Sequence, residues 1–135
     1  MLSIELRCAK IPFLGYLAYH YWFSITDNHN QERWEIWQTQ NIVRSSWGHL
    51  HKNLMTVTQG VGNGDSWLEN QWHEEEAILL STIIRSTPTE YPYNYCYRYY
   101  PGPNSNTYIQ WILDQANINY LLSWRAWGRY YHRKY

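Results

Sequence analysis

A serine in the octapeptide PGPNSNTY, residues 101–108, is the strongest candidate for covalent chemistry in this chain. Two prolines and a glycine interrupt regular structure there, and the apolar periodicity that follows predicts a helix from about Ser105 to Asn117. A helix N-terminus has unpaired backbone N–H groups and the positive end of the helix dipole. The position therefore suits a helix cap, an anion site or an activated nucleophile, and local evidence alone favours a cap at Ser105.

A serine nucleophile needs a general base, and the base needs a group that orients it. His20 is the candidate base, because it lies in the middle of the strongest strand pattern, residues 15–26. Residues 33–40 predict the returning strand of a β-hairpin with a loop of several residues, and Glu35 lies on that strand. Side chains that face each other across a hairpin lie ~5 Å apart, so Glu35 is expected to fix the His20 tautomer. The alternatives are a half-buried His20 bonded to a tyrosine and a solvated Glu35.

The remaining histidines and the cysteines add less. His49 and His51 alternate as on a strand, and His49 is a second candidate to orient His20. Without nearby acidic or thiolate ligands the two histidines are a weak metal signal, so neither a metal nor another cofactor is predicted. Cys8 and Cys96 form no CxxC pair, and the sequence leaves open whether they form a disulfide.

Length and charge limit the classes of partner. The 135 residues predict a single domain, 1–135, and 11 basic residues balance 11 acidic residues. A net charge of zero argues against a nucleic-acid partner and leaves homo-oligomerisation open. The basic, aromatic tail is expected to be a solvated amphipathic end. The run Phe13–Phe23 is too short and too polar to span a bilayer, and no signal peptide is recognisable. A cytoplasmic protein, or one exported by a leaderless route, is expected.

The elements that would position these residues indicate an α+β fold. Residues 3–11 predict another strand, and Leu54–Thr58 could form a third hairpin strand. A helix is predicted over Trp67–Ser86, capped by Asp65 or Ser66 and ended by Pro88. The tyrosine-rich residues 89–100 are expected to be extended. Together these patterns predict a small antiparallel sheet packed by two main helices.

The order of these features resembles a family of uncharacterised bacterial proteins that carry a YPY stretch followed by WPGPNSNTF. The matching segments are Tyr19–Trp22, Trp34–Ile36, Tyr91–Tyr93, Pro101–Tyr108 and Gly128–Tyr130. Tyr100 stands where the family usually has tryptophan. That family is itself similar to the circularly permuted papain-like group, which includes lecithin retinol acyltransferase-like and amidase domains.

The resemblance implies a permuted papain-like fold and a hydrolase or acyltransferase that acts on an amide or ester bond. His20 would be the base, and Ser105 stands where that group has its nucleophilic cysteine. Backbone N–H groups near Asn106 and Thr107 would bind the oxyanion. The substrate would be a peptide, a cell-wall peptide or a lipid ester, and a bacterial effector is one setting for such a domain. Candidate binding residues are Asn104, Asn106, Thr107, Trp22 and Tyr100. The alternative is a non-catalytic binding module with a Trp- and Tyr-lined groove, in keeping with an aromatic content of 19%.

Overall fold

The computed structural model describes residues 1–12, 18–62 and 64–134 of the chain. Within them the elements follow in the order β1 (Leu2–Lys10), β2 (Tyr19–Asp27), β3 (Asn30–Ile36), β4 (Ser46–Trp47), β5 (Leu50–Lys52), β6 (Ser66–His73), α1 (Glu74–Glu90), α2 (Ser105–Gln115) and α3 (Tyr131–Lys134).

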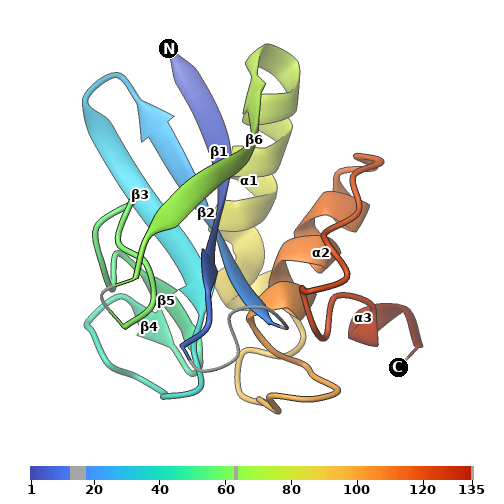
Figure 1. Cartoon of the computed structure of the whole chain (residues 1–135). Helices are drawn as coiled ribbons and strands as arrows, with labels where there is room; N and C mark the ends of the chain where they lie inside the picture. Colours follow the sequence, from blue (N-terminus) through green and yellow to red (C-terminus); the bar gives the residue numbers. More distant parts are fainter. Residues whose placement is uncertain (13–17, 63, 135) are drawn as a thin grey trace.

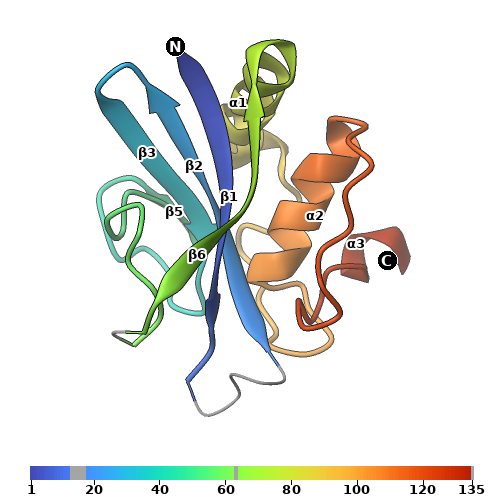
Figure 2. The ribbon, with the colours of Figure 1, turned by 45° about the horizontal axis from the view of Figure 1, so that its top comes forward.

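The strands of the described chain form one antiparallel sheet in the order β4-β5-β3-β2-β1-β6. Helices α1 and α2 pack against one face of this sheet (Figures 1 and 2). The core between them is made of buried apolar side chains from both layers, among them Ile4, Leu6, Phe23, Leu80, Ile84, Ile109 and Ile112. The predicted α+β class, an antiparallel sheet with two main helices, is confirmed.

The other face of the sheet is polar and is also covered. Side chains alternate along a strand, so His20 and Trp22 of β2 point away from the helices, as do Arg33 and Glu35 of β3. The connection after β5 lies over them, because the Trp22 indole N–H donates to the Val57 carbonyl at 3.0 Å. This face is therefore a second buried layer, and it contains the candidate base.

The β2–β3 hairpin is present, with bounds that differ from the prediction. Asp27 pairs with Asn30, so the turn has two residues rather than several, and Asn28 adopts a left-handed φ of 58°. The strand β3 ends at Ile36 instead of residue 40, and the Trp37 N–H makes one more bond in the same register, to the His49 carbonyl. Residues 15–17, where the prediction began the preceding strand, lie outside the described residues.

The possible third hairpin strand at Leu54–Thr58 was predicted in the wrong place. Residues 54–58 contain bends and turns, whereas β4 and β5 pair across Gly48 and His49. Gly48 has a φ of +64°, and a Cβ there would lie only 2.3 Å from the Asn94 carbonyl oxygen. Glycine at this position therefore allows both the tight turn and the close approach of the segment that follows α1.

The first helix begins later than predicted, at Glu74. Residues 66–73 form β6 on the open edge of β1, so neither Asp65 nor Ser66 is a helix cap. Strand pairing of these residues with the free edge of β1 therefore outweighs their local helical periodicity. The N-cap residue is His73, whose side chain makes no capping hydrogen bond, and glutamates 74–76 occupy the first turn, where the helix dipole favours them.

Pro88 lies inside α1 and does not end it. Proline cannot donate to the carbonyl four residues earlier. The Thr87 hydroxyl takes that acceptor instead and donates to the Ile84 carbonyl at 2.6 Å, so the helix continues to Glu90. The tyrosine-rich segment after it was expected to be extended, but residues 92–95 are turns. The Asn94 side chain ties this segment back to the Thr87 carbonyl at 2.9 Å.

Both cysteines are free thiols: Cys8 is buried in β1 and Cys96 is exposed. No helix in the described part of the chain is long and apolar enough to cross a membrane.

Candidate functional site

The N-terminus of α2 is capped by Asn104 and not by Ser105. The Asn104 side-chain oxygen accepts from the backbone N–H groups of Asn106 at 2.9 Å and Thr107 at 3.3 Å. The Thr107 hydroxyl in turn accepts from the Asn104 backbone N–H at 3.1 Å. This is a capping box, and it needs no contribution from the Ser105 side chain.

The same cap occupies the N–H groups of the predicted oxyanion site. The N–H groups of Asn106 and Thr107 already donate to the Asn104 side chain, so in this structure they are not free to bind a substrate oxygen. The sequence pattern predicted the helix start correctly but could not say which N–H groups the cap occupies.

The Ser105 hydroxyl is left without a hydrogen bond to any residue that the structure describes. The residue is 7% exposed, and it lines a small hollow together with Ala18, Tyr97 and Trp127. The volume of this hollow is about 20 Å³, enough for a single water molecule. Ser105 is therefore an unbonded hydroxyl at the end of a capped helix, with a narrow opening in front of it.

Asn106 fixes the position of this helix end against β2. Its side-chain oxygen accepts from the Tyr21 N–H at 3.2 Å, and its amide donates to the Tyr19 carbonyl at 2.8 Å. Tyr19 and Tyr21 lie beyond Phe23, the last β2 residue paired with β3, so the Asn106 amide replaces a strand partner there. The two bonds flank His20, which places the start of α2 directly beside the candidate base.

His20 is held by a buried carboxylate. Its Nε2 lies 2.9 Å from Glu35 Oε1, so the predicted His20–Glu35 pair is confirmed. The Arg33 guanidinium donates to both oxygens of the same carboxylate, through Nε at 2.6 Å and Nη2 at 2.8 Å. A carboxylate only accepts hydrogen bonds, so a neutral His20 carries its proton on Nε2 and leaves Nδ1 as the basic nitrogen. That nitrogen has no partner among the described residues, Ser105 included.

The ionised form of Glu35 is stabilised despite its burial. Burial by itself raises the pKa of this carboxyl, but the hydrogen bond and charge of His20 and those of Arg33 outweigh it and lower the pKa below its usual value. Arg33 is itself fully buried, and its guanidinium lies 3.8 Å from the Trp22 ring centroid. Trp22, a predicted binding residue, is fully buried and supports Arg33 from within.

Arg33 was not identified from the sequence. A signal was available, because Arg33 lies two residues before Glu35 and so shares its strand face. Arginine is usually exposed, so the sequence gives no reason to place Arg33 in the interior until the segment after β5 is known to cover it.

His49 contacts neither His20 nor a metal-binding group in the described part of the chain. Its Nδ1–H donates to the Trp37 carbonyl at 2.9 Å, and its ring stacks on Tyr97 with centroids 5.4 Å apart. Trp37 lies against His20, with ring centroids 4.7 Å apart. His49 is thus linked to His20 through Trp37, whereas Glu35 is the residue that hydrogen-bonds the His20 ring within the described part of the chain.

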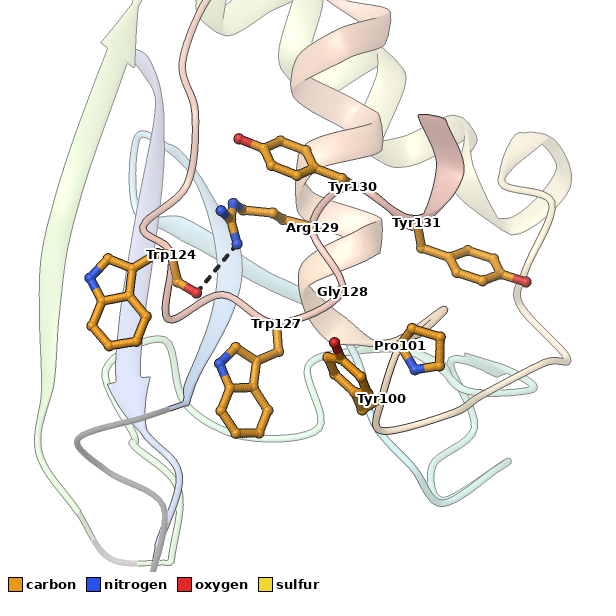
Figure 3. A pocket seen from close by; sticks show the side chains of 8 residues that line it. All are labelled: Tyr100, Pro101, Trp124, Trp127, Gly128, Arg129, Tyr130 and Tyr131. Carbon is orange, nitrogen blue, oxygen red and sulfur yellow. Dashed lines mark hydrogen bonds between the residues drawn. The ribbon is translucent and has the colours of Figure 1, made fainter. Parts of the chain in front are cut away.

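A second, larger hollow adjoins the first. It has a volume of about 590 Å³ and is lined by aromatic side chains and one arginine, as Figure 3 shows: Tyr100, Trp124, Trp127, Arg129, Tyr130 and Tyr131. Trp127 lines both hollows. Tyr100, a predicted binding residue, lies here and is 71% exposed. The C-terminal segment, which was expected to be a solvated amphipathic end, is therefore a wall of a cavity beside Ser105.

The wall is fixed by the first turn of α2. The Thr107 hydroxyl donates to the Gly128 carbonyl at 2.6 Å, and the Asn106 amide donates to the Trp127 carbonyl at 3.1 Å. Gly128 has a φ of +91°, and a Cβ there would lie 2.4 Å from the Asn104 amide nitrogen. The three residues Asn104, Asn106 and Thr107 therefore organise both hollows through their side chains.

Comparison with known proteins identifies a family. Residues 1–131 match the model of a family described as "Protein of unknown function (DUF3750)". The chain belongs to this family. No curated protein matches the chain, and no solved structure matches it. Any function must therefore be argued from the geometry of the site.

Proposed function

We propose that the protein is a hydrolase or acyltransferase that acts on an amide or ester bond, with Ser105 as nucleophile and His20 as general base. The observation that carries this proposal is the buried Glu35 carboxylate, which bonds Nε2 of His20 and leaves Nδ1 as the basic nitrogen, on the strand that Asn106 ties to the start of α2. A permuted papain-like arrangement, with the base on an early strand and the nucleophile at a later helix N-terminus, is the fold that we propose for it.

The placement of the two groups supports this assignment. The β1–β2 ladder continues beyond the strand, because the Ile11 N–H donates to the Ala18 carbonyl. Side chains two residues apart on extended chain share a face, so Ala18 and His20 lie on the same side, about 7 Å apart. Ala18 lines the hollow in front of Ser105, and His20 is the next residue along the chain on the same side as Ala18.

In the proposed reaction the Ser105 Oγ attacks the carbonyl carbon of the scissile bond and gives its proton to His20 Nδ1. The proton then passes to the leaving amine or alcohol, and an ester remains on Ser105. Water, or a second acceptor in an acyl transfer, attacks this ester, again with His20 as base. The Ser105–His20 hydrogen bond forms when substrate is bound, because catalytic hydrogen bonds are often long in the free enzyme.

Labelling with a serine-directed fluorophosphonate tests the proposal. The wild-type protein is expected to be labelled, Ser105→Ala is expected not to be, and His20→Gln is expected to react at least about 100-fold more slowly. Ser3→Ala, at the opposite end of β1, is the control and should label like the wild type. Thermal unfolding of each variant checks that it folds. Labelling that persists in Ser105→Ala, or none in the wild type, contradicts the assignment.

A second function, a non-catalytic binding module, is favoured by one observation. The N–H groups that would bind an oxyanion are occupied by the Asn104 cap, while the larger aromatic hollow is open. This function predicts an unlabelled wild type that still binds ligand in that hollow.

A further inference from the structure

We infer that the larger hollow is a subsite for a carboxylate group attached to an apolar or aromatic body, as at the free end of a peptide. The inference rests on the proposed function and narrows its substrate to an amide or ester that also carries a free carboxylate group. Arg129 is the residue that pairs with the carboxylate, and the surrounding rings contact the apolar part.

The charge of the hollow supports an anionic ligand. No acidic residue is among those that line it, and one guanidinium, that of Arg129, is. Among the described residues Arg129 forms no ion pair, in contrast to Arg33 and Arg133, whose guanidinium groups bind Glu35 and Asp114. A hollow with this lining attracts an anion and offers it no competing carboxylate.

Arg129 also keeps most of its hydrogen-bonding capacity. An arginine guanidinium is a rigid group with several N–H donors. In Arg129 one of them is used: Nη1 donates to the Trp124 carbonyl at 3.3 Å. Its Nε is buried without an acceptor among the described residues. The guanidinium is held in place by stacking, 4.4 Å from the Tyr130 ring centroid, and Figure 3 shows it between Tyr130 and Trp124. A fixed guanidinium with unused donors matches the planar geometry of a carboxylate.

The position of the hollow connects it to the proposed chemistry. Trp127 lines both this hollow and the Ser105 hollow, and the Asn106 amide donates to its carbonyl. A ligand anchored at Arg129 would therefore extend past Trp127 toward Ser105. A volume of about 590 Å³ is enough for an aromatic amino acid but too large for a bare anion to fill.

The test uses two probes that differ only in charge, N-acetylphenylalanine and N-acetylphenylalaninamide, titrated calorimetrically into the Ser105→Ala protein. The carboxylate probe is expected to bind at least about 10-fold more tightly than the amide, as one charge-assisted hydrogen bond provides. Adding Arg129→Gln should remove this preference and leave the amide affinity unchanged. Arg129→Lys keeps the charge without the fork and should retain part of the preference. Arg44→Gln, an exposed arginine outside the hollow, is the control and should have no effect.

Three results would overturn the inference: equal affinity for both probes, unchanged carboxylate binding in a folded Arg129→Gln protein, or inorganic phosphate bound as tightly with the same dependence on Arg129. The last would indicate a general anion site. Because the titration uses a protein without Ser105, its outcome is independent of catalysis. Arg129-dependent binding in a protein that fluorophosphonate does not label would reject the hydrolase and retain the subsite.

Discussion

Replacing Glu35 by glutamine should destabilise the protein strongly while hardly changing its shape. The carboxylate accepts three hydrogen bonds, one from His20 and two from Arg33. Glutamine has a single oxygen, so its amide group would face Arg33 Nε, donor against donor. Arg33 is 0% exposed, and it would remain as a buried charge without a counter-charge. Breaking a buried ion pair from one side costs about 3–5 kcal/mol, and we expect a loss of that size.

A double variant separates the cost of an unpaired charge from the cost of lost packing. Arg33→Met in the Glu35→Gln background removes the buried charge and keeps an unbranched side chain of similar length. We expect it to recover about 2 kcal/mol of the stability lost by Glu35→Gln, since an ion pair replaced as a whole is often close to neutral. If the stability losses of the single variants Glu35→Gln and Arg33→Met simply add up in the double variant, the reasoning is refuted. The two side chains would then stabilise the fold independently.

Urea unfolding followed by tryptophan fluorescence measures these free energies from the midpoint and the slope. Glu32→Gln is a matched control on the same strand. Glu32 pairs with Arg85, whose side chain is 45% exposed, and such surface pairs contribute about 0–1 kcal/mol. A Glu35→Gln protein that loses no more stability than Glu32→Gln would contradict the idea that the buried network is a coupled charge site.

Two further predictions concern acid stability and the wall of the hollows. The folded-state pKa of Glu35 is lowered, so its contribution to stability is complete above the ordinary glutamate pKa and is lost as the pH falls through the lowered value. Between pH 6 and pH 3 the free energy of unfolding, measured with urea, should therefore fall more steeply for the wild type than for Glu35→Gln, by up to about 1.4 kcal/mol per pH unit. Parallel curves for the two proteins would contradict this prediction. Gly128→Ala should lower the free energy of unfolding by about 2–4 kcal/mol, because its φ is +91° and its Cβ would collide with the Asn104 cap. Gly62→Ala is the control, because Gly62 has a φ of +57° and its Cβ would meet the Pro12 ring and no other residue among those described. An equal loss in both variants would mean that the cap is not displaced.

Local patterns in the sequence were enough for the core of the site. Alternation along β2 and β3 placed His20 and Glu35 on one face of the hairpin. The paired register ends at Phe23 and Trp34, so the two side chains meet diagonally, at 2.9 Å. Turn and capping residues predicted the start of α2 at Ser105. These features depend on neighbours within a few residues, so the sequence of a short segment is sufficient to predict them.

Features that need a distant partner were missed or misplaced. Residues 66–73 have a helical pattern but pair with the open edge of β1 as β6. The Asn104 cap is itself local, but the packing of Gly128 from the C-terminal segment against the Asn104 amide is not. In each case the local sequence of one segment carries no information about the distant segment that it contacts.

The sequence by itself determined that a histidine and a carboxylate lie on neighbouring strands of one hairpin and that a loop leads to Ser105 at a helix N-terminus. The tertiary structure decided that Asn106 holds this helix end beside His20, and that Trp127 and Arg129 form a cavity wall there. The physical reason is the sequence distance over which each kind of interaction acts. Periodicity and capping act within a few residues, whereas these contacts join segments of the chain that are 21 to 87 residues apart.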